Sequence, residues 1–279
     1  MLTTHEWARR WEGSPLLWRD DYTAPSVFQP QNMLRESRRQ KGLPRGDVPE
    51  VCILDPDADI VRLVRSANAA TPCPNWACFH TEMWEWRHRG RRVGIVGGAV
   101  GGSFAVLVAE QLVASGCALL VSMASAGQVS PDLELPAYVL IERALRDEGT
   151  SHHYLPVSPF VDADEKLVAR AEAAFRSRGH RVVRGTTWTT AAPFRETEAV
   201  IAERRRQGIL TVEMEAASLL AFSKARRTSV VCLAHVTNQL GRFEGDFEKG
   251  ELNGSSHSLA LALAVADAWQ DETTARKDA

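Results

Sequence analysis

The stretch RRVGIVGGAVGGSFAVLVAEQLVASGCALLVSMASAGQ, Arg91 to Gln128, decides the fold class of this chain. A short apolar run enters a glycine-rich loop, a long apolar segment follows and is closed by Gly116, and a second apolar run ends in small residues. This order predicts a strand, a tight turn, a helix and another strand. Continuous apolar strands joined by a helix are typical of a parallel sheet that is covered on both faces.

The same alternation continues on both sides of this stretch. Further strands are expected at EVCIL (50–54), AYVLIERAL (137–145), HRVVRGTTWTT (180–190) and TSVVCLAHVTN (228–238). Further helices are expected at 58–67, 162–179, 211–227 and 255–270. We therefore expect one α/β domain over 49–270, with a central mixed and mostly parallel sheet flanked by helices. An N-terminal arm over 1–48 is expected to belong to the same domain, and 271–279 to form a flexible tail.

The composition favours a large apolar core and a small-molecule partner. The 279 residues are 44% hydrophobic and 24% charged, with a formal net charge of −2. Lys and Arg are scattered, which argues against nucleic-acid binding. No apolar run approaches the roughly 18 residues that a membrane helix needs, and the N-terminus does not resemble a signal peptide, so we expect no membrane partner and a cytoplasmic location. The five dispersed cysteines predict neither a disulfide framework nor a metal site.

Four polar or glycine-rich segments follow expected strands, at the edge where open α/β sheets bind their ligands. They are Gly97–Gly102, Ser122–Gln128, Thr186–Thr197 and His235–Asn238. In the first of them, backbone N–H groups such as that of Gly101 are suited to cradle an anion. The alternative is that these glycines only form a tight turn. His235 lies in a buried run and is interpreted as a core histidine.

Glu213 and Glu215 raise a question, because carboxylates are seldom buried without a partner. They flank Met214 at the start of an expected Ala- and Leu-rich helix. Residues two apart on a helix point about 200° apart, so one glutamate is expected to accept N–H bonds at the helix N-terminus. The other is expected to point into the strand-end cleft, where a carboxylate suits a sugar diol and an oxocarbenium-like charge. Alternatively, both only complement the helix dipole.

The stretch VEMEAASLLAFSKARRTSVVCLAHVTN resembles the signature of the nucleoside phosphorylase/uridine phosphorylase superfamily. The glycine loop with its helix and second strand, and ERALRDEGTSHHYLP, are also similar to segments of that superfamily. The resemblance runs from about Val51 to Trp269 and is strongest at Glu213–Ala217. It implies the superfamily's α/β fold and a nucleoside-type pocket.

The resemblance also implies roles for individual residues. Glu215 matches the catalytic residue that grips the sugar hydroxyls, next to Met214, and Glu213 is placed with them among the substrate-binding residues. Asn238 falls at the position that contacts the base. An amide there presents a donor and an acceptor together, which points to a 6-oxopurine or a pyrimidine. The alternative for Asn238 is a turn residue.

The segment Thr189–Thr197 corresponds to the superfamily's base-covering loop. There Phe194 is expected to stack on the base, and Arg195 or Glu196 to hydrogen-bond to it. Ala191 occupies a position where an acid is expected among similar sequences.

The phosphate site departs from the superfamily's pattern. Leu54 and Ala58 stand at the Gly and Arg positions of the G-D-P-x-R turn, and Ser122 stands at a second Arg position. Of the residues that form the superfamily's phosphate site, only Ser125 is kept in this sequence. Each charge-assisted contact contributes about 1.5–3 kcal/mol, so phosphate is only a possible co-substrate, and no other cofactor is expected. Water is one replacement, and Arg195 or Arg146 reaching in from another segment is another way to bind phosphate.

The sequence thus leads to an enzyme that cleaves the N-glycosidic bond of a nucleoside with a 6-oxopurine, pyrimidine or modified base, by phosphorolysis or hydrolysis. One alternative is an enzyme of a specialised pathway that acts on an unusual nucleoside-like substrate. Another is a non-catalytic nucleoside-binding protein. A homo-oligomer, dimer or hexamer, is expected because related pockets borrow a residue from a neighbouring subunit, typically a histidine, at whose position Gln29 stands here.

Overall fold

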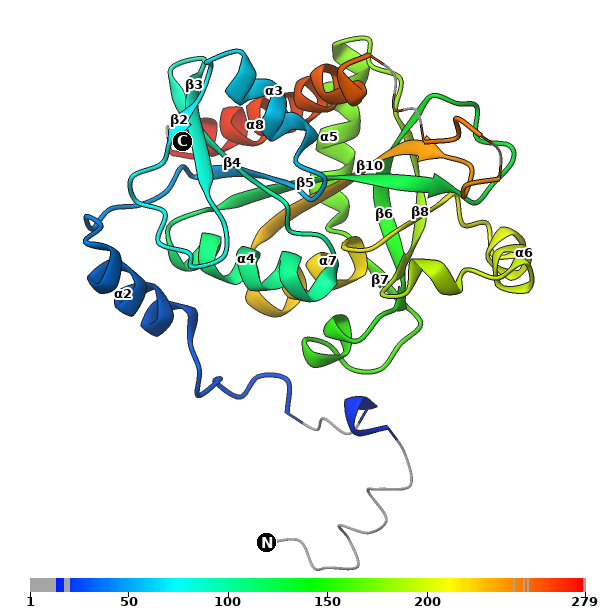
Figure 1. Ribbon diagram of the computed structural model, residues 1–279, viewed down its shortest axis with the longest axis horizontal. Helices are drawn as coiled ribbons and strands as arrows, with labels where there is room; N and C mark the ends of the chain where they lie inside the picture. The colour runs from blue at the N-terminus through cyan, green and yellow to red at the C-terminus, as the bar shows by residue number, and fades with distance from the viewer. Residues whose placement is uncertain (1–13, 18–20, 243, 248, 250, 278–279) are drawn as a thin grey trace, which may run out of the picture.

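The computed structural model describes residues 14–17, 21–242, 244–247, 249 and 251–277. One sheet runs through the middle of the molecule between two layers of helices (Figure 1). Helices α3, α5 and α8 lie on one face of the sheet, and α4 and α7 lie on the other. This arrangement confirms the predicted α/β fold with a central sheet flanked by helices.

The sheet is mixed, and its strands follow the order β10-β6-β8-β9-β5-β1-β4-β3-β2. Parallel pairing joins β1 to β4 and β5, β5 to β10, and β8 to β6 and β9. The strands are β1 (Val51–Asp55), β2 (Thr71–Pro72), β3 (Met83–His88), β4 (Arg91–Gly97), β5 (Leu119–Gln128), β6 (Ala137–Asp147), β7 (Phe160–Asp162), β8 (Val183–Thr190), β9 (Thr211–Glu213) and β10 (Ser229–Asn238).

Five strands close into a ring at one side of the sheet. Strand β5 pairs with β10, β10 with β6, β6 with β8, β8 with β9, and β9 with β5 again. The ring brings the last residues of β5 beside both the end of β10 and the short strand β9, since Gly127 pairs with Asn238 and with Val212. Segments far apart in the sequence therefore meet at one edge.

Each helix layer buries its own apolar cluster against the sheet. One cluster contains Ala105, Leu112 and Leu219 from α4 and α7, and the other contains Ile60 and Leu261 from α3 and α8. The helices are α2 (Pro30–Lys41), α3 (Asp59–Ser66), α4 (Gly102–Ala114), α5 (Glu165–Ser177), α6 (Glu198–Arg206), α7 (Ala216–Arg226) and α8 (Ser255–Lys277). Short 3₁₀ turns are η1 (Pro15–Leu17), η2 (Thr150–His153), η3 (Pro193–Arg195) and η4 (Glu251–Gly254).

The prediction of one helix over 211–227 was wrong at its start. Residues Thr211–Glu213 form the buried strand β9, and α7 begins only at Ala216. The reason is tertiary, because pairing with β5 and β8 satisfies the backbone of β9 on both sides and outweighs the local helix preference. Strand β3 and helix α6 were not predicted, and α8 runs past residue 270 to Lys277.

Within the described ranges, no helix combines the length and apolar character that crossing a bilayer requires.

Candidate active site

Hydrogen bonds connect the segments that follow the strands. The N–H of Gly101, in the glycine loop after β4, donates to the carboxylate of Glu215 before α7. The N–H of Ser125, near the end of β5, donates to Asp57 in the loop after β1. Two of the four predicted segments, the glycine loop and the end of β5, therefore each donate a backbone N–H to a carboxylate from another segment.

Glu213 anchors the start of α7. It is 4% exposed, and its Oε2 accepts the N–H groups of Glu215 and Ala216, each at 2.7 Å. Its Oε1 accepts the hydroxyl of Thr189, which in turn accepts the N–H of Ala217 at 2.9 Å. Burial nevertheless raises the pKa of Glu213 to about 7. Of the two glutamates, Glu213 thus makes the N–H bonds expected at the helix N-terminus, but from a strand and not from the helix.

Glu215 faces the glycine loop instead. It is 3% exposed, and its Oε1 lies 2.6 Å from the backbone nitrogen of Gly101. Burial and the negative charge of Glu213 raise the pKa of Glu215 to about 8. The carboxyl group is therefore poised between its neutral and charged forms near neutral pH, and a ligand that supplies hydrogen bonds or positive charge would favour the charged form. A sugar-binding role for Glu215 and Met214 stays a prediction.

The backbone N–H of Ser125, near the end of β5, is already bonded to a carboxylate of the protein. Asp57 Oδ2 accepts the N–H of Ser125 at 3.0 Å and lies 3.5 Å from Lys249 Nζ. The same ammonium lies 2.8 Å from Asp59 Oδ2. These groups line a cavity of about 10 Å³, together with Asp55 and His235. The cavity has the size for about one water molecule.

Sequence reasoning missed Asp57 and Lys249. The run LDPDAD shows three alternating acids, but nothing local to it indicates that Asp57 accepts the N–H of Ser125. Lys249 gave no signal, because only the folded chain brings it to the loop after β1.

Two further buried titratable groups border this cavity. Asp55 is 2% exposed and accepts the N–H of Val61 at 2.9 Å, and burial raises its pKa to about 7. His235 is buried and stacks on Tyr138 with ring centroids 4.5 Å apart. Burial and the nearby charge of Lys249 lower the pKa of His235 to about 4, so the ring is neutral near neutral pH. This agrees with the interpretation of His235 as a core histidine.

Asn238 sits at the end of β10 in a turn. Its side-chain oxygen accepts the N–H of Leu240 at 3.0 Å, and its NH₂ group donates to the hydroxyl of Thr237 at 3.2 Å. The turn role weighed for this residue is therefore observed. The amide keeps a second hydrogen and a second lone pair, so base recognition by Asn238 stays a prediction.

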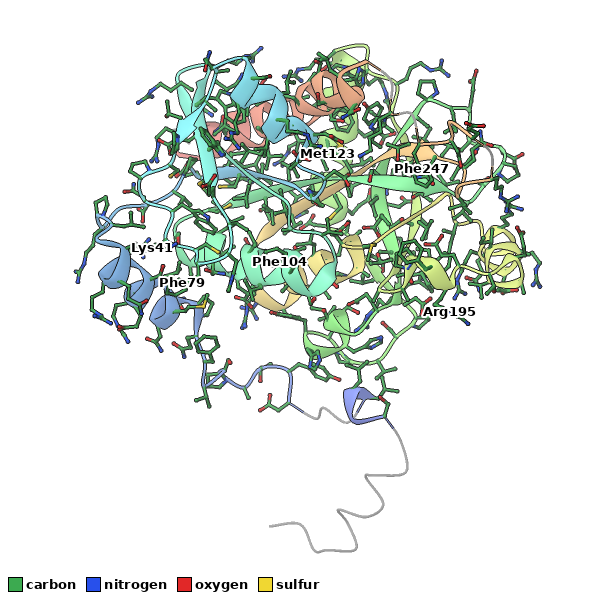
Figure 2. The ribbon with its side chains drawn as sticks, in the orientation of Figure 1. Lys41, Phe79, Phe104, Met123, Arg195 and Phe247 are labelled. Atoms are coloured by element: carbon green, nitrogen blue, oxygen red, sulfur yellow. The ribbon has the colours of Figure 1, made fainter. Side chains whose placement is uncertain are left out.

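The segment predicted to cover the base starts inside β8, which ends at Thr190 as the expected strand over 180–190 does. Phe194 lies in η3 and is 99% exposed. Figure 2 shows Arg195 beside α6, well separated from Met123 near the middle of the sheet. Glu196 is partly buried, and this burial raises its pKa to about 7. Contacts of these three residues with a base stay predictions.

Arg146 is not available for phosphate. Its guanidinium donates to Ser151 Oγ at 2.9 Å, Ser158 Oγ at 2.8 Å and the carbonyl of Pro156 at 2.7 Å. The side chain thereby organises the loop after β6 and is 6% exposed. The alternative in which Arg146 replaces a missing phosphate arginine is wrong, because its donors already have partners.

No group of three or more His, Cys, Asp or Glu residues in the described part of the chain is arranged to hold a metal ion.

Comparisons with known proteins agree with the predicted fold. A model of the phosphorylase superfamily matches residues 49–266. The chain is similar to a DeoD-type purine nucleoside phosphorylase of Myxococcus xanthus, at 26% identity over 64% of this chain and 76% of that protein. It is also similar to a uridine phosphorylase of Thermococcus kodakarensis, at 28% identity over 59% of this chain and 66% of that protein.

A solved structure shares the fold. The crystal structure of an AMP nucleosidase from Bacteroides thetaiotaomicron VPI-5482 matches with a TM-score of 0.70 and 16% sequence identity. The match covers 88% of this chain and 100% of that chain. At this identity the likeness concerns the fold alone.

Proposed function

This chain belongs to the phosphorylase superfamily, and on that premise we propose that it cleaves the N-glycosidic bond of a nucleoside by hydrolysis. The sequence left phosphorolysis and hydrolysis open. One observation carries the choice between them: Asp57 places a carboxylate on the N–H of Ser125, the surviving member of the phosphate cluster. Water is then the nucleophile that this side of the site accommodates.

Electrostatics argue against a phosphate ion at Ser125. Asp55, Asp57 and Asp59 line the same small cavity, and the single ammonium of Lys249 is shared between Asp57 and Asp59. Two like unit charges 4 Å apart repel by about 4 kcal/mol at the effective dielectric constant of a protein surface. A phosphate dianion beside Asp57 would add such a repulsion for each of its charges.

Space supports the same conclusion. The cavity beside Ser125, Asp57 and Lys249 measures about 10 Å³. A volume of about 10–15 Å³ holds one water molecule, and a phosphate ion, with five heavy atoms, needs several times more.

The proposed reaction uses three groups. Glu215 accepts hydrogen bonds from the sugar hydroxyls, and its charged form stabilises the positive charge that develops on the sugar. Asn238 donates an amide N–H to a carbonyl oxygen of the base. When the C1′–N bond breaks, the glycosidic nitrogen of the base takes the electron pair and is protonated from solvent. The oxygen of the attacking water molecule bonds to C1′, and Asp57 accepts the proton that this water molecule loses.

The substrate class follows from relatives and from Asn238. Two relatives are named as purine nucleoside and uridine phosphorylases. The amide at the end of β10 offers a donor and an acceptor, which match the lactam edge of a 6-oxopurine or a pyrimidine. Inosine, guanosine and uridine are therefore the first substrates to test. A homo-oligomer, dimer or hexamer, stays a prediction.

The test is product analysis with and without phosphate. Inosine, guanosine and uridine are incubated with the protein in phosphate-free buffer and in phosphate buffer, and base, ribose and ribose 1-phosphate are separated by chromatography. We expect free base and free ribose at rates that phosphate does not increase. The appearance of ribose 1-phosphate would show phosphorolysis instead, and no base release in either buffer from these or modified nucleosides would overturn the enzymatic function.

A further inference from the structure

A basic groove lies at the other end of α4, away from the candidate active site. This open groove of about 790 Å³ is formed by α2, the loop after it and the last turn of α4. Its lining includes four arginines and a single acid, Asp47: the arginines are Arg35, Arg38, Arg39 and Arg45. Figure 2 shows Lys41, at the end of α2, on the opposite side of the molecule from Arg195 and Phe247.

Three of these arginines share one face of α2. Arg35, Arg38 and Arg39 are spaced i, i+3 and i+4, so their side chains project from the same side of the helix. Arg35 and Arg39 both pair through Nε with the carboxylate of Glu36, at 3.0 and 2.9 Å. One carboxylate thus balances two guanidinium groups. Arg35 Nη1 also donates to Asn32 Oδ1 at 3.0 Å, and the other terminal N–H groups of the two arginines are left for another acceptor.

Arg45 adds a further cation from the loop after α2. Within the described ranges, its side chain makes no hydrogen bond or ion pair. Asp47 and Glu36 supply two negative charges against four positive ones, so the groove is cationic.

Two buried polar atoms of the lining lack partners in the described part of the chain. Ser115, at the end of α4, is 2% exposed, and its Oγ has no hydrogen-bond partner. Arg38 Nε is likewise buried without an acceptor, although the same guanidinium donates through another nitrogen to the carbonyl of Asn75 at 3.3 Å. Buried donors without acceptors are rare in folded proteins and call for an explanation. Both residues line the groove, so a ligand oxygen would satisfy these covered atoms once the lining adjusts to admit it.

The dipole of α2 accounts for only part of this arrangement. Basic side chains favour the last turn of a helix, which explains Arg38 and Arg39. Arg45 lies beyond the helix, and Ser115 is uncharged and belongs to a different helix. A shared anionic ligand accounts for all four residues together.

We propose that this groove binds a phosphorylated small molecule of nucleotide size, through the four arginines and the hydroxyl of Ser115. Guanidinium groups match phosphate oxygens in geometry and charge. The volume of about 790 Å³ falls within the range of roughly 300–1,000 Å³ that is typical of ligand pockets and far exceeds that of an inorganic phosphate ion. The groove is separated from Gly101 by the whole of α4, 13 residues or about 20 Å, so it does not depend on the proposed hydrolysis.

Binding is tested by calorimetry on the full-length protein with inorganic tripolyphosphate and with ADP. Tripolyphosphate has neither sugar nor base, so it reports on the groove and not on a nucleoside pocket. We expect the double substitution Arg38→Ala/Arg45→Ala to weaken binding of both probes by at least about tenfold. The matched control, Arg181→Ala/Arg206→Ala, removes the same charge from exposed positions elsewhere and is expected to bind like wild type.

A second variant separates a built site from general charge attraction. Ser115→Ala leaves the net charge unchanged and removes one buried donor, and we expect it to weaken binding by about threefold to tenfold. Arg45→Ala alone removes no described contact, so it gives a folded test protein even where the double variant does not fold. ADP is expected to bind more tightly than a single-stranded oligonucleotide.

Three results would overturn the proposal. They are equal affinity of wild type and Arg45→Ala for both probes, an equal loss in the Arg181→Ala/Arg206→Ala control, and tighter binding of the oligonucleotide than of ADP. The last result would assign the groove to nucleic acid.

Discussion

Replacing Glu215 with glutamine is expected to stabilise the protein at slightly alkaline pH and to have much less effect in acid. Glutamine has nearly the same volume, and its amide oxygen is able to accept the Gly101 N–H that Glu215 accepts at 2.6 Å. The substitution therefore removes the titration of a carboxyl group that is 3% exposed and leaves its packing in place.

The magnitude follows from the raised pKa. Burial and Glu213 shift the pKa of Glu215 from 4.5 to about 8. The folded protein then binds the proton more tightly than the unfolded chain, so this group's contribution is most favourable below pH 4.5 and is lost as the pH rises through about 8. Each pKa unit corresponds to about 1.4 kcal/mol, so wild type is expected to lose about 3 kcal/mol relative to Glu215→Gln between about pH 5 and about pH 8.

The assay is reversible urea unfolding of wild type and Glu215→Gln at both pH values. The control is Glu134→Gln, whose side chain is 83% exposed and whose effect is expected to be the same at both. If the stability difference between wild type and Glu215→Gln changes by less than about 1 kcal/mol between the two pH values, Glu215 is not held in a site that disfavours its charge, and the reasoning about its pKa is refuted.

Three other substitutions test neighbouring parts of the site and its support. Asp57→Asn is expected to lower kcat for base release by at least about a hundredfold with little change in KM, and an unchanged kcat in steady-state kinetics would exclude Asp57 as the proton acceptor. Thr189→Val leaves an oxygen of Glu213 without its donor and is expected to lower the free energy of unfolding by about 2 kcal/mol in urea titrations, with equal stability contradicting the network. Gly102→Ala would place a methyl group against the hydroxyl of Ser218 and is expected to lower the free energy of unfolding by about 1–3 kcal/mol in thermal melts. Adding Ser218→Gly in the same chain should restore most of that stability. An undiminished stability of Gly102→Ala would contradict the close approach of α4 and α7.

Much of the fold follows from local pattern. The alternation of apolar strands and amphipathic helices predicted β1, β4, β5, β6, β8 and β10, as well as α3, α4, α5 and α8. Asp164, for example, caps α5 by accepting two backbone N–H groups at its start, a signal that is complete within a few residues. Periodicity and caps are short-range properties, so a sequence displays them directly.

The candidate site was predictable only where its residues adjoin such signals. The glycine loop and the two glutamates were found, because one follows a strand and the others precede an apolar helix. Their partners were not found: that Glu213 serves the helix start and Glu215 the glycine loop depends on β9, a three-residue strand. A strand that short has no periodicity of its own and exists because β5 and β8 lie on either side of it.

The sequence by itself determined the class of fold and the family and predicted the edge of the sheet for ligand binding, since these depend on patterns within neighbouring residues. Only the tertiary structure decided which charged groups lie near Ser125, where the superfamily's phosphate-binding arginines are absent. Asp57 reaches the N–H of Ser125, and Lys249, far along the chain, balances the acids beside it. Such charge pairings are set by the path of the whole chain through space, and no local pattern of residues encodes them.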